Sequence, residues 1–241
     1  MVDNVLLTRT LVDFASRLVS DYDISEMLHD LCDRTVEVLS VSGAGVMLED
    51  EDSHLRFVAA SDDAVRTIES LQIELGEGPC LRAYRTGEQV VVHDLLSRGD
   101  LFPNFAERAL SAGMRAVYSF PMRVGSQRVG ALNLYNGRPI QFEGQDCVAA
   151  QGLADVATTA ILNQRMLAES NRVVTQLQHA LDSRVVVEQA KGKLSEQLDL
   201  PVAEAFEVLR RHARSHGRKL QLVAAEVMAG ELVLRPGSDG R

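Results

Sequence analysis

A short basic strip in the last third of the chain carries the side chains with the clearest chemistry. Arg184, Glu188 and Lys191 stand at i, i+4 and i+7 in residues 183–194, a stretch with helical spacing, so they share one face of a helix. Glu188 could pair with both bases, which would make the strip an ordinary solvated face. Such exposed pairs stabilise a helix by only about 0.3–0.5 kcal/mol, which is a weak reason for having them. The alternative chemistry is binding of the phosphate groups of a nucleic acid.

The charge of the chain is divided unevenly along the sequence. The net charge is -9, and residues 1–170 contain 14 Arg and no Lys against 25 acidic residues, whereas residues 171–235 contain 10 basic and 8 acidic residues. This asymmetry predicts a polyanionic partner for the C-terminal segment. Aromatic residues are scarce and Trp is absent from the sequence, so charge and shape, rather than base stacking, would provide the contacts.

A second basic group is expected where one helix, at about residues 201–216, ends and the next begins. Its members are more numerous than the helix dipole alone would favour, and they are Arg210, Arg211, Arg214, Arg218 and Lys219. In the first strip, Ala190 and Gly192 are small enough to let the helix approach a partner helix or an RNA backbone closely. A glycine inside a helix costs about 0.5–1 kcal/mol relative to alanine, and close approach would give that cost a reason.

Other reactive residues do not form a recognisable catalytic or metal site. His212 and His216 have the i, i+4 spacing of zinc ligands but lack a third ligand nearby, and His93 with Asp94 most simply ends a strand and caps a helix. The three cysteines are an odd number at unrelated spacings, which is typical of a reducing compartment. The chain start does not resemble a signal peptide, and no apolar run is long enough to span a bilayer. We therefore expect a cytoplasmic protein with no catalytic residue, cofactor, metal or membrane partner.

The first two thirds of the chain predict an α+β domain with a mostly antiparallel sheet. Helical spacing is expected in residues 3–20 and 25–41, and shorter helices at 62–71, at 81–86 and up to 112. Short apolar runs separated by turn residues predict strands at 44–49, 54–60, 90–92, 117–124 and 129–135, mainly in hairpins.

Several motifs within residues 20–165 resemble the GAF sensor domains of actinobacterial regulators. They are the stretches 78–87 (GPCLRAYRTG), 94–95 (DL), 112–113 (AG) and 130–135 (GALNLY), in that order. The resemblance implies an antiparallel sheet of about six strands flanked by helices, and a domain that holds a small ligand or a partner domain. The ligand stays unidentified, because the sequence lacks the pattern linked to cyclic nucleotides in some GAF domains. Cys80, close to an expected helix N-terminus, is either a buried inert thiol or a reactive one.

Residues 144–197 contain no proline and predict one very long helix or two nearly continuous ones. Apolar side chains recur every seven residues, with Val156 and Leu177 in the intervening stripe. This pattern predicts a homodimeric coiled-coil seam of Leu153, Ala160, Leu167, Val174, Leu177 and Leu181. Polar residues occupy the rest of that stripe and could fix the register. The alternative is that the first half of this seam, through residue 165, packs on its own sheet.

The C-terminal part predicts three helices: the end of the long one, one from 201 to 216 and one from 220 to about 232. The stretches LQHALDSR at 177–184, EQAKG at 188–192 and EAF at 204–206, followed by Leu209 and Leu220, resemble the ANTAR domain over about residues 174–232. That family is a three-helix module that binds RNA and prevents transcription termination. This chain departs from the family at Lys193, where an apolar residue is usual, at Ser195, often Met, and at Leu200-Pro201, often Gly followed by Ser or Thr.

These observations predict a sensor domain at 1–165, a connecting coiled-coil helix at 143–183, an ANTAR domain at 174–235 and a disordered tail at 236–241. The resemblance implies an antitermination regulator that binds paired stem-loops in nascent RNA and contacts RNA polymerase only indirectly. Because Lys193 belongs to the basic stretch 183–194, we also expect it to bind RNA. A second hypothesis is a ligand or redox sensor whose C-terminal helices dock a protein. A third, methionine sulfoxide reduction, would need a cysteine spacing that Cys32, Cys80 and Cys147 do not match.

Overall fold

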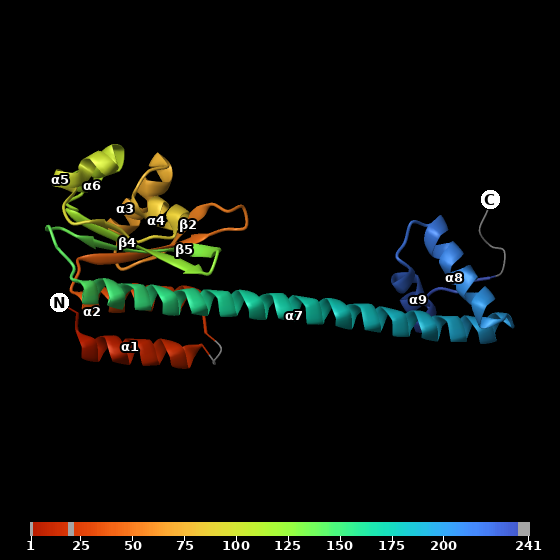
Figure 1. Cartoon of the computed structure of the whole chain (residues 1–241). Coiled ribbons are helices and arrows are strands. Elements are labelled where there is room, and N and C mark those ends of the chain that lie inside the picture. Colours follow the sequence, from red (N-terminus) through yellow and green to blue (C-terminus); the bar gives the residue numbers. More distant parts are fainter. Residues whose placement is uncertain (1, 19–21, 236–241) are drawn as a thin grey trace. The chain divides into compact units, whose positions relative to one another are not determined.

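The computed structural model describes residues 2–18 and 22–235, and the tail expected at 236–241 lies outside them. The chain divides into two compact units, Met1–Met166 and Leu167–Arg241, which we call the N-terminal and the C-terminal domain (Figure 1). The long helix contributes residues to both.

The N-terminal domain is built on a five-stranded antiparallel sheet with the order β2-β1-β5-β4-β3. Its strands are β1 (Gly43–Glu49), β2 (Leu55–Ala60), β3 (Val90–Val92), β4 (Ala116–Val124) and β5 (Gln127–Asn136). The hairpins expected for β1–β2 and β4–β5 are confirmed, and β5 pairs with β1 to join them. The sheet has five strands, one fewer than the family resemblance suggested.

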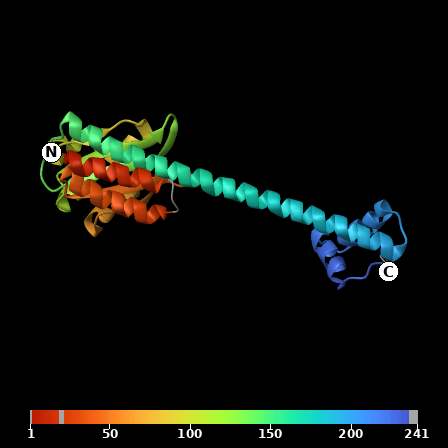
Figure 2. The same ribbon diagram turned by 90° about the horizontal axis from the view of Figure 1, so that it is seen from below.

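Helices cover both faces of this sheet. Those of the N-terminal domain are α1 (Asn4–Arg17), α2 (Ile24–Leu39), α3 (Asp63–Leu75), α4 (Pro79–Thr86), α5 (Leu95–Arg98), the 3-10 turn η1 (Gly99–Leu101) and α6 (Pro103–Ser111). On one face lie α2 and the first part of α7 (Gly144–Leu198), with α1 packed against them, and on the other lie α3, α4 and α6 (Figures 1 and 2). Asp23 and Asp62 cap α2 and α3 with their carboxylates.

The expectation of a long helix is confirmed, since α7 is a single helix of 55 residues. In the C-terminal domain it is followed by α8 (Val202–Ser215) and α9 (Leu220–Ala229). The predicted end of the last helix at residue 232 is wrong, because Gly230 adopts a left-handed conformation with φ 78° and ends α9 three residues earlier than its apolar pattern. Within residues 2–18 and 22–235, no helix combines the length and apolarity needed to cross a membrane.

The C-terminal domain has a small core. Nine apolar residues are buried there, four of them alanine: Ala190, Leu194, Ala205, Leu209, Ala213, Val223, Ala224, Val227 and Leu234. Alanines at the contacts let the three helices pack closely, but they provide little apolar area per residue.

Candidate nucleic-acid interface and sensor site

The basic strip on α7 lies at the surface of the C-terminal domain. Arg184 is exposed, and among the described residues it has no ion pair or hydrogen bond through its guanidinium. Lys191 is more enclosed: its Nζ lies 2.8 and 3.0 Å from the two Glu188 carboxylate oxygens and 5.1 Å from the centre of the Phe206 ring. Of the two bases that Glu188 could pair with, it therefore pairs with Lys191 and leaves Arg184 open to solvent.

The cation–π contact places the strip beside one particular face of α8. Arg210 and Arg214 follow Phe206 by one and two helical turns, so they extend the same face of α8. Arg210 donates a hydrogen bond of 3.0 Å to Glu207, whereas Arg211 and Arg214 are exposed on the side of α8 away from the buried Leu209.

The turn between α8 and α9 contains two cations, one paired with a carboxylate and one exposed. Arg218 forms a double hydrogen bond with the Glu226 carboxylate, which raises the pKa of Arg218 and lowers that of Glu226. Lys219 is the residue before α9 and has an exposed side chain. Arg184, Arg211, Arg214 and Lys219 are thus the predicted RNA-binding cations that keep their charge uncompensated within the described chain.

Two residues predicted to face RNA have structural positions instead. Ala190 is fully buried in the three-helix core, so it allows α8 and α9 to approach α7 rather than contacting an external partner. Lys193 extends across to α9, where its Nζ donates to the carbonyl oxygens of Val227 and Met228 at 2.8 and 3.0 Å. These carbonyls lie in the last turn of α9, where a cation is favourable.

Gly192 is exposed, and no atom of the described chain lies within 4 Å of the position that a Cβ would take. Internal packing therefore gives no reason for this glycine. Close approach by an external partner stays a prediction.

The departures from the family at the α7–α8 turn also have a structural explanation. Asp199 adopts a left-handed conformation with φ 52°, and the Ser195 hydroxyl donates a hydrogen bond of 2.6 Å to the carbonyl oxygen of Leu200. Pro201 is the residue immediately before α8, with φ -54°. A side chain from α7 and a fixed backbone angle hold this turn in place of the usual hydroxyl cap.

The predicted dimer seam divides at the domain boundary. Leu153 and Ala160 are fully buried against their own sheet, so the expectation that they belong to a seam between chains is wrong, and the alternative of packing within the domain describes them. From Leu167 on, the seam residues are open: Leu167, Val174, Leu177 and Leu181 are 54%, 61%, 60% and 59% exposed. A row of exposed apolar residues on one helix is typical of a surface that another protein covers.

His212 lies on α8 and His216 directly follows that helix. The rings of His212 and His216 stack with their centres 4.1 Å apart. Among residues 2–18 and 22–235, no group of three His, Cys, Asp or Glu side chains is arranged to hold a metal ion.

The N-terminal domain contains a buried polar network between α3 and the sheet. Asn133 on β5 donates to both carboxylate oxygens of Glu69, at 2.9 and 3.0 Å. Gln72, one turn along α3, donates to the Tyr135 hydroxyl and accepts from the backbone amide of Cys80. Burial raises the pKa of Glu69 to about 8, although hydrogen bonds from Asn133 and Tyr135 oppose the change. This carboxyl group is therefore mostly neutral at pH 7.

The glycine of β1 opposite this network explains how a glutamate fits there. A Cβ at Gly45 would lie 2.3 Å from a Glu69 carboxylate oxygen, so only glycine leaves the necessary room. Since Glu69, Gln72 and Asn133 are fully buried, the protein's own side chains fill the space above the middle of the sheet.

The cysteines are free thiols. Cys32 and Cys80 are fully buried, and burial raises the pKa of Cys80 well above the ordinary thiol value. Of the two interpretations of Cys80, the structure supports the inert one, because the neutral thiol is neither nucleophilic nor exposed.

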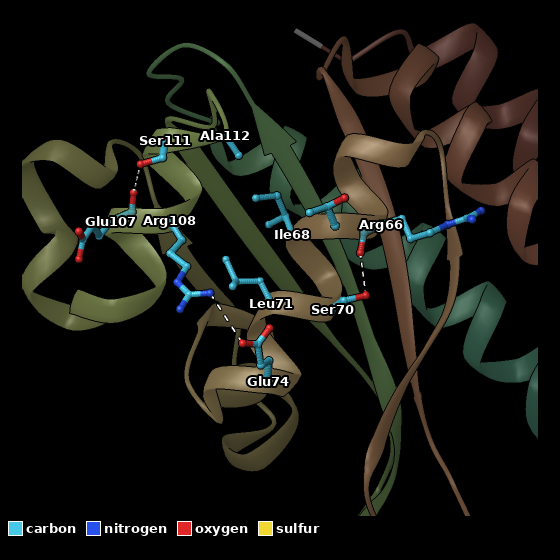
Figure 3. A pocket seen from close by; sticks show the side chains of 10 residues that line it. Arg66, Ile68, Ser70, Leu71, Glu74, Glu107, Arg108, Ser111 and Ala112 are labelled. Carbon is cyan, nitrogen blue, oxygen red and sulfur yellow. Dashed lines mark hydrogen bonds and ion pairs between the residues drawn. The ribbon is translucent and has the colours of Figure 1, made fainter.

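A groove of about 720 Å³ separates α3 from α6 (Figure 3). Ile68 and Leu71 form its floor, and Arg108 reaches across it to Glu74 with a distance of 3.7 Å. Arg66 points away from the groove, toward the Phe57 ring. Ser70 and Ser111 donate to carbonyl oxygens of their own helices (Figure 3). Both arginines and both serines that line this groove therefore already have partners within the domain.

A second pocket, of about 630 Å³, lies where the β1–β2 and β4–β5 hairpins meet α4 and α7. Its lining includes Arg85, Arg128 and Arg165, none of which the sequence reasoning singled out. The available signal was that the acidic N-terminal part uses arginine as its sole basic residue type, 14 times. Their convergence from three elements could not be read from their spacing.

The comparisons with known proteins agree with the two domains. A family model described as GAF domain matches residues 21–162, and one described as ANTAR domain matches residues 175–228. No curated protein matches the chain.

Solved structures share the fold of the N-terminal domain. The GAF domain of a phosphoenolpyruvate-protein phosphotransferase from Coxiella burnetii is 16% identical with a TM-score of 0.56, covering 69% of this chain and 99% of that one. The corresponding Acinetobacter domain is 15% identical with a TM-score of 0.53, covering 68% and 96%. Free methionine-R-sulfoxide reductase from Neisseria meningitidis is 18% identical with a TM-score of 0.53, covering 69% and 96%. At these identities the likeness concerns the fold alone.

The five-stranded sheet, the helices on both its faces and the three-helix unit that follows thus agree with both family matches. The chain belongs to the GAF domain family and has the GAF-ANTAR architecture of a signal-sensing regulator.

Proposed function

We propose that this protein is a cytoplasmic, homodimeric RNA-binding regulator of transcription antitermination, whose GAF domain senses a signal and controls binding of the ANTAR domain to paired stem-loops in nascent RNA. The observation that carries the proposal is the set of uncompensated cations on the ANTAR domain: Arg184 on α7, Arg211 and Arg214 on α8, and Lys219 before α9. RNA polymerase is affected only indirectly, through the structure of the transcript.

Charge and shape are sufficient for this kind of recognition. Lysine and arginine displace counterions from the phosphate backbone, which gives affinity without base stacking. In the loops of RNA hairpins the bases are unpaired, and a helix face can approach the charged backbone. Lys191 and Arg210 lie beside the free cations, each paired with a glutamate. We infer that RNA phosphates compete with Glu188 and Glu207 for these two side chains.

The exposed stripe at Leu167, Val174, Leu177 and Leu181 supports the proposal of a dimer. Heptad spacing favours a second copy of the same helix as the cover, because knobs-into-holes packing needs a matching repeat on the partner. Two copies would present two sets of cations, one for each stem-loop of a pair.

RNA binding is tested with the full chain and a labelled RNA that contains two tandem stem-loops. We expect the double variant Arg184→Gln/Arg214→Gln to bind at least about tenfold more weakly, and the salt dependence of binding to become shallower by about one to two phosphate contacts. Arg9→Gln on α1 is the matched control, since Arg9 is exposed in the other domain. Equal affinity of the double variant and the control, at unchanged helicity, would refute the RNA interface.

The alternative of protein docking is separated by crosslinking in cells. Enrichment of specific transcripts with the wild type, and its loss in the double variant, supports RNA binding. Recovery of no RNA above background would support docking of a protein instead.

The dimer is tested by sedimentation of the full chain. We expect a dimer at tens of micromolar, and a monomer for Leu177→Asp/Leu181→Asp, because two carboxylates would be placed in an apolar interface. Val233→Asp is the control, because Val233 is an apolar residue after α9 and is 76% exposed. A monomeric wild type at that concentration would rule out the seam.

A further inference from the structure

The pocket between the two hairpins, α4 and α7 differs in charge from the rest of its domain. Arg85 lies on α4, Arg128 on β5 and Arg165 on α7, and all three line one pocket of about 630 Å³. Within the described residues, no carboxylate lies within 4 Å of any of these guanidinium groups. All three side chains are exposed, so an anion from solvent can reach them, and their combined positive charge attracts one.

The only carboxylate in the lining is that of Glu49. Burial and then the nearby Glu49 raise the pKa of Tyr84, so this carboxylate lies close to the tyrosine hydroxyl. One carboxylate offsets only part of the charge of three guanidinium groups. Asp50, the next residue, is hydrogen-bonded to Arg56 at 2.6 Å and has a lowered pKa for that reason. The pocket therefore keeps a positive charge near its mouth.

Two of the three arginines contact other lining residues of the pocket. Arg128 lies over the Tyr84 ring, 5.6 Å from its centre, and Arg165 donates a hydrogen bond of 2.9 Å to the carbonyl oxygen of Glu49. Neither contact neutralises the guanidinium, and each leaves other N–H groups free to donate. Ser53, Ser126 and Gln127 supply further donors at the rim.

The groove between α3 and α6 provides an internal comparison. It is slightly larger, but Arg108 there is paired with Glu74, and Arg66 lies 3.7 Å from Asp63 and points away. Its charges are balanced within the protein, whereas those of the arginine pocket are not. Size alone would favour the groove, and charge favours the arginine pocket as the site of an ionic ligand.

We propose that Arg85, Arg128 and Arg165 form a binding site for a small phosphorylated metabolite, whose phosphate groups receive hydrogen bonds from the three guanidiniums. Arginine is suited to this role because its planar fork of donors matches two phosphate oxygens at once. A volume of about 630 Å³ is in the range of sites for molecules the size of a nucleotide. The site is concave and formed by three separate elements, which favours a small molecule over the continuous backbone of RNA.

The location also offers a route to regulation. Arg165 is the last but one residue of the N-terminal domain on α7, directly before the exposed stripe that begins at Leu167. A ligand that holds Arg165 acts on the helix that both domains share. This regulatory meaning rests on the proposed function, whereas binding of the ligand does not.

The binding claim is tested by calorimetry on the full chain, without RNA, using inorganic pyrophosphate and adenosine 5′-triphosphate as probes and ribose as the uncharged control. We expect heat of binding with at least one phosphorylated probe and none with ribose. In Arg85→Gln/Arg128→Gln the affinity should fall about tenfold or more, because charge-assisted hydrogen bonds are lost. Arg85→Gln alone, which leaves the Tyr84 contact intact, should show a smaller loss in the same direction.

Two controls locate the binding. Arg9→Gln should bind the probes as the wild type does, and so should Arg211→Gln/Arg214→Gln, which removes charge from the ANTAR domain only. The absence of binding at about 10 mM probe, or equal affinity of Arg85→Gln/Arg128→Gln and wild type, would overturn the proposal. So would a loss confined to the Arg211→Gln/Arg214→Gln variant. If Arg85→Gln/Arg128→Gln instead weakens RNA binding and leaves the probes unaffected, the pocket is an RNA contact.

Discussion

The two domains of this protein differ in where they hold their polar side chains. The N-terminal domain has a polar network inside its core, and the C-terminal domain has its charged side chains at the surface. The N-terminal domain buries Glu69, Gln72 and Asn133 between a helix and the sheet, where they are hydrogen-bonded and closed to solvent. The C-terminal domain buries nine apolar residues, four of them alanine, and carries its charges outside. A large core can hold a polar network at some cost in stability, whereas a core this small cannot. A change in the N-terminal domain can therefore begin at a buried polar group, whereas the C-terminal domain has its charged groups for binding at the surface.

The largest expected effect is the loss of stability when a core leucine of either domain is replaced by alanine. Leu209→Ala should cost about 2–5 kcal/mol of unfolding free energy, since Leu209 is fully buried, and this is enough to unfold a domain of this size. The matched change Leu132→Ala in the N-terminal sheet should lower the melting temperature of that domain but leave it folded. Calorimetry with separate transitions is the measurement. A single transition shifted equally by both variants would contradict the comparison.

The next effect concerns the buried acid of the N-terminal domain. The folded state holds the pKa of Glu69 at about 8 against an ordinary value of 4.5, so between these values the folded state binds more protons than the unfolded one. Stability should therefore fall as pH rises from about 4.5 to 8, by an amount on the order of a few kcal/mol, and level off above 8. Glu69→Gln should remove this slope, because the amide is uncharged and can still accept from Asn133. Urea titrations at several pH values provide the test, and an unchanged slope in the variant would disprove the assignment.

A smaller loss of stability is expected at Lys193, which contacts α9, whereas the uncompensated RNA-binding cations predicted in this domain are exposed. Lys193→Met restores the apolar residue usual in the family and removes the contact with the last carbonyls of α9, at a cost of about 1 kcal/mol. RNA affinity at a temperature where the domain stays folded should be unchanged. A variant of wild-type stability with weakened RNA binding would return Lys193 to the RNA interface.

The smallest expected effect is at Gly192. Gly192→Ala should stabilise α7 by about 0.5–1 kcal/mol, since the added methyl group meets no atom of the described chain. If RNA or a partner helix approaches there, the same variant should bind RNA more weakly despite its greater stability. Thermal unfolding and anisotropy titrations on one preparation separate the two results, and unchanged affinity would show that the glycine serves no close contact.

Local patterns predicted much of the fold because the relevant physics is local. The apolar runs separated by turn residues in the hairpins and the absence of proline from residues 144–197 each act within a few residues of chain, and the hairpins and the long helix that they predicted are confirmed. The end of α9 was missed because the apolar pattern continues beyond Gly230, while the backbone does not. The predicted cations on α7 and α8 could be placed on helix faces, but which of the two bases pairs with Glu188 could not be predicted.

The sequence by itself determined the order of elements, the length of α7 and the split of charge between an acidic and a mildly basic segment, since spacing and composition are properties of the chain alone. Only the tertiary structure decided what covers each face. The same heptad pattern is buried at Leu153 and Ala160 and exposed from Leu167 on, because the sheet covers the first part and nothing in the described chain covers the second. Likewise, Arg85, Arg128 and Arg165 are far apart in sequence, and folding alone brings them to one pocket.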